Sequence, residues 1–452
     1  MTSVDRRRLE HLVERERAAF RLAHPRSAEL FSEARHLFGG VPMTWMSKWA
    51  GGYPLYLDSA HGCQVVDVDG LSYVDFALGD TGAMAGHSPG PTVDAVVERI
   101  GRLGGITTML PTADAEWVGA ELERRFGLPL WSFALSATDA NRWAVRLARL
   151  VTGRPKILVF SYCYHGSVDE TFVVLDHDGV ARSRPGNVAP PVDPLLTTRV
   201  AEFNDLAGVE AELAHGDVAA VLCEPALTNI GIVLPAPGFM EGLRAATRRH
   251  GSLLMLDETH TFSAGPGGCT MAWGLSPDIV TIGKAIGGGV ASGAYGLSSG
   301  VAALVGGHES ADLVDVGGVG GTLAGNALSV AAMRATLGEV LTAGAFTHMD
   351  DLAVRFVTGV EEVMARHGAP WSVTRLGARA EYRFTHPAPT TGSESAAAED
   401  ETLDEYLHLA LCNRGVLITP FHNMALMCPA TTVRDVDRHT AAFDAALSDL
   451  FS

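Results

Sequence analysis

Residues 251–296 constrain the fold of this chain more than any other stretch. They contain two short apolar runs, at 253–256 and 279–282, and each is bounded by glycine, proline or charged residues. Such runs are typical of buried strands in a parallel sheet. The first run leads into Asp257 and the second into Lys284. Because the carboxyl ends of parallel strands face one ligand crevice, we expect both side chains to reach the same pocket.

Lys284 is one of only three lysines, together with Lys48 and Lys156, although lysine and arginine number 34 in all. Since the chain otherwise uses arginine, a lysine in this glycine-flanked stretch favours amine chemistry. An amine can lose its proton and form an imine, which a guanidinium group cannot do. The alternative is a lysine at a strand end that extends into solvent. Asp257 before it and the glycines at 287–289 after it favour the chemical role.

Short apolar runs alternate with helical periods from Trp131 onward. This alternation predicts an α/β fold, with helices on both faces of a mainly parallel sheet. A long loop rich in Pro, Asp and Arg is expected at 174–196. We expect strands at 131–136, 156–160, 198–202, 219–223, 252–256 and 278–282, and helices at 139–152, 206–215 and 237–250.

The composition changes near Gly344, which predicts a second, smaller unit of helices and antiparallel strands. A polar linker is expected within it, at 391–400. The expected division is therefore an N-terminal segment at 1–62, a large domain at 63–343 and a small α+β C-terminal domain at 344–452.

The N-terminal segment opens with an arginine-rich amphipathic pattern over residues 1–36. Two tryptophans and two methionines then lie within residues 42–49, and they form either a core hairpin or one wall of a substrate pocket. Residues 65–74 alternate around an Asp-Gly pair, which predicts a β-hairpin.

Charge and cysteine usage limit the classes of partner. The formal net charge of −18 argues against nucleic acids and anionic membranes as partners. No apolar run reaches the roughly 18 residues of a transmembrane helix, and the charged N-terminus lacks the apolar core of a signal peptide. The six cysteines show no disulfide or metal spacing. These features predict a cytoplasmic enzyme without a metal.

Ser136, Ala137 and Thr138 lie where a predicted strand ends and a predicted helix begins. Hydroxyl groups and free backbone N–H groups at a helix N-terminus form a natural seat for a phosphate. The alternative is an ordinary N-cap.

Four motifs follow one another along the chain: YCYHG at 162–166, EPALTNIG at 224–231, the stretch from Asp257 to Lys284, and GTLAGN at 321–326. This order resembles the class III aminotransferases, a branch of the fold-type I enzymes that depend on pyridoxal 5'-phosphate (PLP). The glutamate-1-semialdehyde aminomutase-like branch is the most similar. The resemblance implies a fold-type I α/β architecture and PLP as the cofactor.

The resemblance also implies a role for each motif residue. Lys284 forms the internal aldimine with PLP and then serves as general base and acid. Asp257 pairs with the pyridine nitrogen and keeps the ring cationic. For His165 a structural hydrogen bond is expected, and the alternative is a ligand. The remaining roles are phosphate binding by Ser136, Ala137 and Thr138, ring stacking by Tyr164, a bond from Asn229 to the phenolate oxygen, ordering of the polar network by Glu224, and contact of Thr322 with the phosphate of the partner subunit in a homodimer.

The chain departs from the family pattern where substrates are recognised. The C-terminal stretch ITPFHNMALM has no arginine to bind a carboxylate, and His422 stands where the aminomutase has a glutamate. Both points argue against glutamate-1-semialdehyde as the substrate. We expect an apolar pocket built from Met43, Trp45, Met46, Phe421, Met424 and Met427, and candidate substrate residues Trp45, Lys48, His260 and His422.

We therefore expect a PLP-dependent aminotransferase. It would move an amino group between a primary amine or β-amino acid with an apolar or aromatic substituent and a keto acid or ketone. The alternative is a PLP-dependent aminomutase, or another isomerase or decarboxylase of the same family, because PLP does the chemistry and small pocket differences select the bond that breaks.

Overall fold

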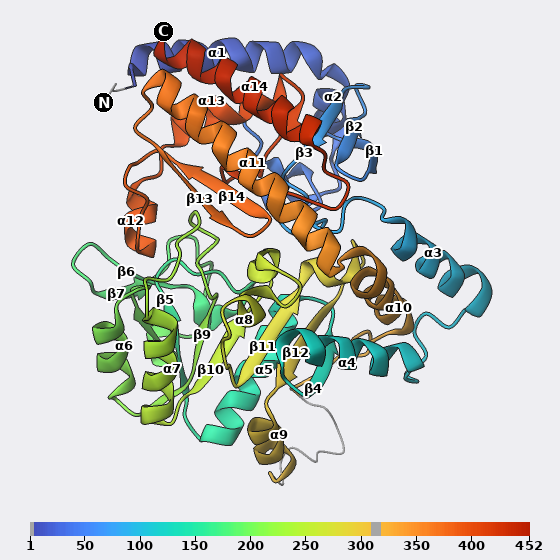
Figure 1. Ribbon diagram of the computed structural model, residues 1–452, viewed down its shortest axis with the longest axis vertical. Coiled ribbons are helices and arrows are strands. Elements are labelled where there is room, and N and C mark those ends of the chain that lie inside the picture. The colour runs from blue at the N-terminus through green and yellow to red at the C-terminus, as the bar shows by residue number, and fades with distance from the viewer. Residues whose placement is uncertain (1–3, 309–317) are drawn as a thin grey trace. The chain divides into compact units, whose positions relative to one another are not determined.

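The computed structural model describes residues 4–308 and 318–452. The chain forms two compact units, shown in Figure 1. The smaller unit contains Met1–Pro89, Ala345–Ala388 and Ala398–Ser452. The larger unit contains Gly90–Gly344 and Pro389–Ala397.

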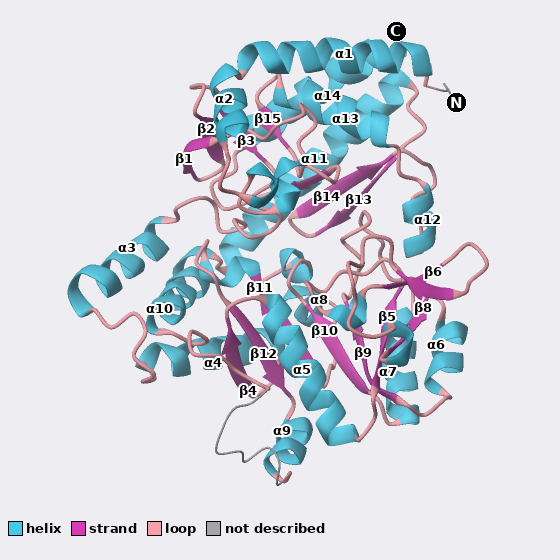
Figure 2. Ribbon diagram, turned by 180° about the vertical axis from the view of Figure 1, so that it is seen from behind, coloured by secondary structure: helices cyan, strands magenta, loops and turns pink. Residues whose placement is uncertain are grey.

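A seven-stranded sheet forms the centre of the larger unit, in the order β4-β12-β11-β10-β9-β5-β8 (Figure 2). Neighbouring strands are parallel except where β12 pairs antiparallel with β11 and β4. All six predicted strands are present, and the expected α/β fold with a mainly parallel sheet is confirmed. The bounds are β4 Leu130–Ala134, β5 Lys156–Phe160, β8 Thr198–Ala201, β9 Val218–Cys223, β10 Leu253–Asp257, β11 Ile279–Gly283 and β12 Gly293–Leu297.

Helix α5 (Ala137–Thr152) shows how the sequence sets an element of this unit. The Ser136 side chain accepts a hydrogen bond from the backbone N–H of Asp139, so the helix begins two residues before its predicted start. Gly153 ends it in the left-handed conformation. The other helices of the larger unit are α3 Gly90–Glu98, α4 Ala113–Phe126, α6 Leu206–Leu213, α7 Phe239–His250, α8 Gly268–Ala272, α9 Ser299–Gly306, α10 Ala327–Ala335 and α12 Gly392–Ala397.

Two parts of the larger unit differ from the expectation. Strand β12 was not predicted, because its sequence GAYGL contains glycines that tight packing requires: a Cβ at Gly296 would lie 2.6 Å from the Trp131 ring. The predicted loop at 174–196 contains a small hairpin of β6 (Val173–Leu175) and β7 (Ala181–Ser183).

The smaller unit contains two small sheets, ordered β1-β2-β3-β15 and β13-β14-β16. The predicted hairpin at 65–74 is present as β2 and β3. The strands are β1 Leu57–His61, β2 Gln64–Asp67, β3 Ser72–Asp75, β13 Ser372–Leu376, β14 Arg379–Arg383, β15 Val416–Leu417 and β16 Met424–Leu426; the helices are α1 Arg6–Ala23, α2 Pro25–Glu33, α11 Ala343–His367, α13 Glu401–Cys412 and α14 Val433–Phe451.

The pairing of β3 with β15 changes the expected domain division. Val74 and Asp75 lie beside Val416 and Leu417 in a parallel pair, so residues 63–89 join the C-terminal elements and not the large domain. The polar linker expected at 391–400 contains α12, and Pro389–Ala397 join the larger unit.

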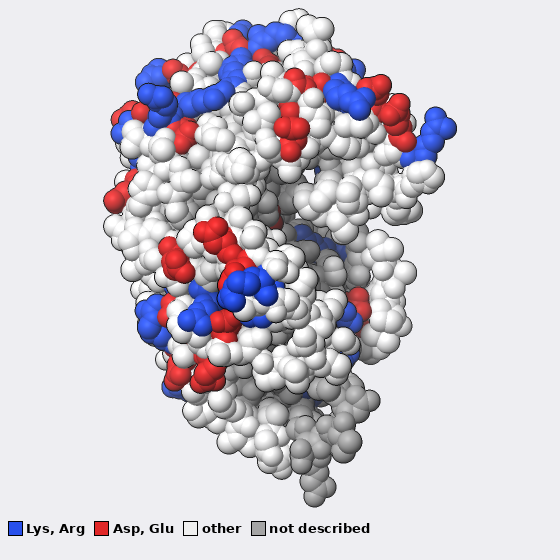
Figure 3. Space-filling view, turned by 90° about the vertical axis from the view of Figure 1, so that its right-hand side faces the viewer, with Lys and Arg blue, Asp and Glu red and all other residues white. Residues whose placement is uncertain are grey.

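Figure 3 shows that basic and acidic side chains intermingle on the face in view. Within residues 4–308 and 318–452, no helix is both long and apolar enough to span a membrane.

Candidate active site

Lys284 lies directly after β11, in a left-handed backbone conformation with φ of 50°. A positive φ is unfavourable for a side chain with a Cβ and is characteristic of functional sites. Its Nζ lies 2.8 Å from the Nε2 of His260. His260 is 8% exposed and follows β10, the neighbouring strand. The amine of Lys284 is thus placed beside a group that can exchange a proton with it.

Asp257 ends β10 and is almost completely buried. Its Oδ2 accepts hydrogen bonds from Asn141 Nδ2 at 2.8 Å and from His165 Nδ1 at 3.0 Å. Its Oδ1 accepts the Thr259 backbone N–H at 3.0 Å. The Thr281 hydroxyl donates to Asn141 Oδ1 at 2.6 Å, which turns the amide nitrogen of Asn141 toward the carboxylate.

Electrostatics keep this buried carboxylate charged. Burial opposes charge on both Asp257 and His165. Cys163 and Asp257 nevertheless raise the pKa of His165 well above its usual value. The hydrogen bond and charge of His165, followed by Thr259 and Asn141, lower the pKa of Asp257. Asp257 is therefore an anion at the carboxyl end of β10, where it can pair with a cationic ring.

The end of β11 closely approaches the N-terminus of α5. A Cβ added at Gly283 would lie 2.8 Å from the backbone nitrogen of Ala137. The Ser136 cap and the Thr138 hydroxyl, which accepts the Ser167 backbone N–H at 3.2 Å, belong to the same turn. The predicted phosphate seat therefore lies against the residue that precedes Lys284.

Tyr164 and Asn229 lie on the loops that follow β5 and β9, at the same edge of the sheet as Asp257. Both side chains are partly buried. Glu224, directly after β9, is 2% exposed and accepts a hydrogen bond from the Thr228 hydroxyl. Glu224 thereby braces the loop that carries Asn229.

Thr322 is exposed within the larger unit and precedes α10. Ile106 and Leu323 near it are also exposed, and the Ile106 carbonyl accepts the Ala327 backbone N–H at 3.1 Å. The segment around Thr322 is thus joined to an exposed apolar loop.

Trp45, Lys48 and His422 belong to the smaller unit. Residues 37–49 form short helical turns and no strand, so the core-hairpin alternative is wrong. Trp45 and Phe421, in edge contact with ring centroids 6.2 Å apart, line a cavity of about 210 Å³.

Other members of the predicted apolar pocket lie elsewhere. Met424 and Met427 are fully buried in the core, because β16 pairs with β14, and the cavity lining does not include them. His422 lies 3.5 Å from the fully buried Glu381. Burial lowers the pKa of His422, but Glu381 raises it above the usual value overall.

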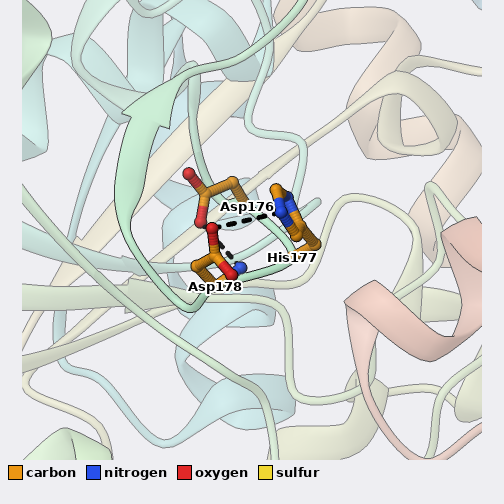
Figure 4. A group of neighbouring side chains, drawn as sticks. All are labelled: Asp176, His177 and Asp178. Carbon is orange, nitrogen blue, oxygen red and sulfur yellow. Dashed lines mark hydrogen bonds and ion pairs between the residues drawn. The ribbon is translucent and has the colours of Figure 1, made fainter.

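Figure 4 shows three potential metal ligands, Asp176, His177 and Asp178, in the turn between β6 and β7. Asp176 accepts the backbone N–H groups of Asp178 and Val180 and also binds Arg182 Nε at 3.1 Å. These contacts show that Asp176 stabilises the hairpin turn, and the turn brings the three side chains together.

The sequence did not point to Asn141 or Thr281 as part of the site. The register of the parallel pair β10–β11 places Asp257 beside Thr281, and Asn141 lies one turn inside α5. For Thr281 the available signal was a polar residue inside the apolar strand β11, whereas Asn141 lies in the amphipathic helix α5 and left no such signal. The expected structural hydrogen bond of His165 is present.

These residues fit PLP. A buried anion, a lysine amine and a helix N-terminus converge on one sheet edge, and they match a cationic ring nitrogen, an aldehyde and a phosphate respectively. When bound, PLP supplies an electron sink that allows a proton to leave the carbon that carries the substrate amine.

Comparisons with known proteins agree with this fit. The family Aminotransferase class-III matches residues 45–447. The glutamate-1-semialdehyde 2,1-aminomutase of Desulforudis audaxviator (strain MP104C) is 33% identical over 435 residues, 95% of this chain and 99% of that protein.

Solved structures extend the comparison. A glutamate-1-semialdehyde-aminomutase from Pseudomonas aeruginosa PAO1 is 49% identical, with a TM-score of 0.96 over 99% of this chain and 100% of that one. A lysine-to-alanine variant of it was crystallised with PMP. An omega-transaminase from Sphaerobacter thermophilus is 30% identical, with a TM-score of 0.84 over 94% of this chain and 98% of that one. These relatives favour the aminomutase alternative over the expected aminotransferase. The chain belongs to the class III aminotransferase family and is a PLP-dependent fold-type I enzyme.

Proposed function

We propose that this enzyme is a 2,1-aminomutase acting on glutamate-1-semialdehyde or a close analogue. It moves the amino group between neighbouring carbons of one molecule. The observation that carries the proposal is the similarity to the Pseudomonas aeruginosa aminomutase over nearly the whole chain. The main sequence argument against this proposal is that His422 stands where the aminomutase has a glutamate. Glu381, which lies 3.5 Å from His422, supplies a carboxylate close to that position and weakens the argument.

The residues of the site divide the work. Lys284 holds the cofactor and, once released, takes a proton from one substrate carbon and returns it to another. His260, 2.8 Å from the lysine amine, receives or returns a proton at Nζ and keeps the amine oriented. Asp257 pairs with the ring nitrogen, and Asn141 and His165 hold Asp257 in place.

The remaining contacts fix the cofactor in space. Ser136, Ala137 and Thr138 bind the phosphate at the N-terminus of α5. Tyr164 stacks on the ring, and Asn229 donates to its phenolate oxygen. Glu224 supports the Asn229 loop through Thr228.

We further propose a homodimer in which Thr322 of the partner subunit contacts the phosphate. Thr322 is exposed within its own subunit, and so are its apolar neighbour Leu323 and Ile106, whose carbonyl accepts the Ala327 backbone N–H. Contiguous exposed apolar side chains mark association surfaces.

A transaminase is the second candidate. It is supported by the apolar cavity that Trp45 and Phe421 line, and by the similarity to the omega-transaminase. In this case the amine donor carries an apolar or aromatic group and the acceptor is a separate keto acid or ketone.

One experiment separates the two. Purified enzyme loaded with PLP is incubated with glutamate-1-semialdehyde without any keto acid, and the products are followed by NMR. An aminomutase forms 5-amino-4-oxopentanoate in many turnovers, and the Lys284→Ala variant forms none. If the semialdehyde is unchanged while an aromatic amine and pyruvate give alanine, the transaminase is correct and the aminomutase is wrong.

A further inference from the structure

The segment Pro389–Ala397 belongs to the larger unit, although the residues on both sides of it belong to the smaller one. It contains the short helix α12. Its contacts fall just beyond the carboxyl ends of β8, β5 and β9, which are neighbours in the sheet. Loops at this edge carry the proposed cofactor residues.

The contact beyond β8 is a set of hydrogen bonds. The Ser393 hydroxyl donates to Glu202, and the backbone N–H groups of Gly392 and Ser393 also reach this carboxylate. Asn204 Nδ2 donates to the Thr390 carbonyl at 2.8 Å. These hydrogen bonds tie the half-buried carboxylate of Glu202 to the segment, and burial raises the pKa of Glu202 although they oppose the shift.

The contact beyond β5 is a close backbone approach. A Cβ added at Gly392 would lie 2.3 Å from the carbonyl oxygen of Ser161. Ser161 is buried and lies three residues before Tyr164. The segment therefore presses directly on the base of the loop that carries the proposed stacking tyrosine.

The contact beyond β9 is a buried hydrogen bond. The Ser395 hydroxyl donates to the carbonyl of Ile230, and Ser395 is 1% exposed. Ile230 follows Asn229 directly in the chain. Without this hydroxyl the buried Ile230 carbonyl would lose its donor, a loss that is costly away from water.

We propose that residues 389–397 form a positioning element of the cofactor site. Ser395 and Gly392 hold the Asn229 and Tyr164 loops, and Glu202 anchors the element at its start. The inference rests on the proposed roles of Tyr164 and Asn229. It predicts that loosening this element changes how the cofactor is bound before any substrate is present.

The test is a PLP titration of the full-length protein, followed by the pH dependence of the absorption band of the bound cofactor. The variants are Ser395→Ala and Gly392→Ala, with Ser32→Ala as the matched control. Ser32 lies in α2, outside the segment, and is exposed, and its hydroxyl donates to the Glu29 backbone carbonyl at 2.8 Å, so this variant removes the same kind of hydrogen bond at an exposed position. Glu202→Gln, which keeps an acceptor for Ser393, is compared with Glu202→Ala.

We expect Ser395→Ala to weaken PLP binding by roughly 5- to 50-fold and to shift the pH midpoint of the band. Ser32→Ala leaves both unchanged, and Glu202→Gln lies closer to wild type than Glu202→Ala. The inference is overturned if Ser395→Ala binds PLP with wild-type affinity and midpoint. It is also overturned if Ser395→Ala lowers only the melting temperature. If Gly392→Ala does not fold, Ser395→Ala still decides. Failure of the wild type to bind PLP would instead refute the proposed function.

Discussion

The side-chain amide of Asn141 donates to the buried carboxylate of Asp257 at 2.8 Å, and Thr281 fixes the orientation of that amide from the neighbouring strand. A helix and a strand therefore hold one oxygen of Asp257 in a set position. Second partners of this kind orient a functional group and keep it in the required charge state.

Replacing Asn141 with alanine removes a hydrogen bond to a charged, buried acceptor. We expect kcat/KM to fall roughly 10- to 100-fold, because such bonds contribute about 1.5–3 kcal/mol. Thr281→Val, which frees the amide without removing it, should have a smaller effect in the same direction. Steady-state kinetics of both variants check this. Unchanged kinetics for Asn141→Ala would show that the bond does not support Asp257.

His260 is the next residue to test, because its Nε2 lies 2.8 Å from the Lys284 amine. We expect His260→Ala to lower kcat by about 10²-fold, the lower range for assisted proton transfer, with KM little changed. His260→Gln should recover part of the loss, since it keeps a hydrogen-bonding group. A rise in KM at constant kcat would instead identify His260 as a substrate-binding residue.

A substitution at Gly283 tests the close approach of β11 to the proposed phosphate-binding turn at Ala137. In Gly283→Ala the new Cβ would lie 2.8 Å from the Ala137 nitrogen and 3.0 Å from its Cβ, so the backbone must move. We expect a melting temperature lower by several degrees and PLP affinity weakened at least tenfold. Gly300→Ala is the matched control, because its Cβ in α9 meets no atom within 4 Å. Equal behaviour of the two variants would contradict the close approach.

His439 should make the protein sensitive to acid. It is fully buried, with ring centroids 4.3 Å from Phe356 and 5.8 Å from Phe443. Burial lowers the pKa of His439 to about 3. Below pH 6.5 His439 is therefore protonated in the unfolded chain but stays neutral in the native state, which lowers the free energy of unfolding. Above pH 6.5 His439 is neutral in both states and contributes no pH dependence. Stability at pH 5 should be lower than at pH 7.5 by roughly 2 kcal/mol from this residue alone.

The variant His439→Phe should reduce this difference in unfolding free energy between pH 5 and pH 7.5, measured by denaturant titration. Part of the difference remains, because burial also lowers the pKa of His408 to about 4. The exposed His177→Gln is the control. An undiminished acid loss in His439→Phe would show that other groups cause it.

The sequence was most informative where apolar runs alternate with helical periods. Strand β5 occurs at its predicted residues, and β10 and β11 lie within one residue of theirs, because buried parallel strands are continuous apolar segments. The sequence pointed to Asp257 and Lys284 as candidate site residues for the same reason, since each lies at the carboxyl end of such a strand.

Long-range contacts explain what the sequence did not reveal. The pairing of β3 with β15 joins residues more than 300 positions apart and moves 63–89 into the smaller unit. The docking of α12 depends on Gly392, because any side chain at this position would collide with the Ser161 carbonyl. That requirement is visible only in the folded structure. Neither feature leaves a local pattern.

The most direct test of the account is to find which lysine holds the cofactor. The PLP-loaded enzyme is reduced with borohydride, digested and analysed by mass spectrometry. The chain has three lysines, so the result is unambiguous: we expect the phosphopyridoxyl group on Lys284 alone. A label on Lys48 or Lys156, or no label despite bound PLP, would contradict the proposed site.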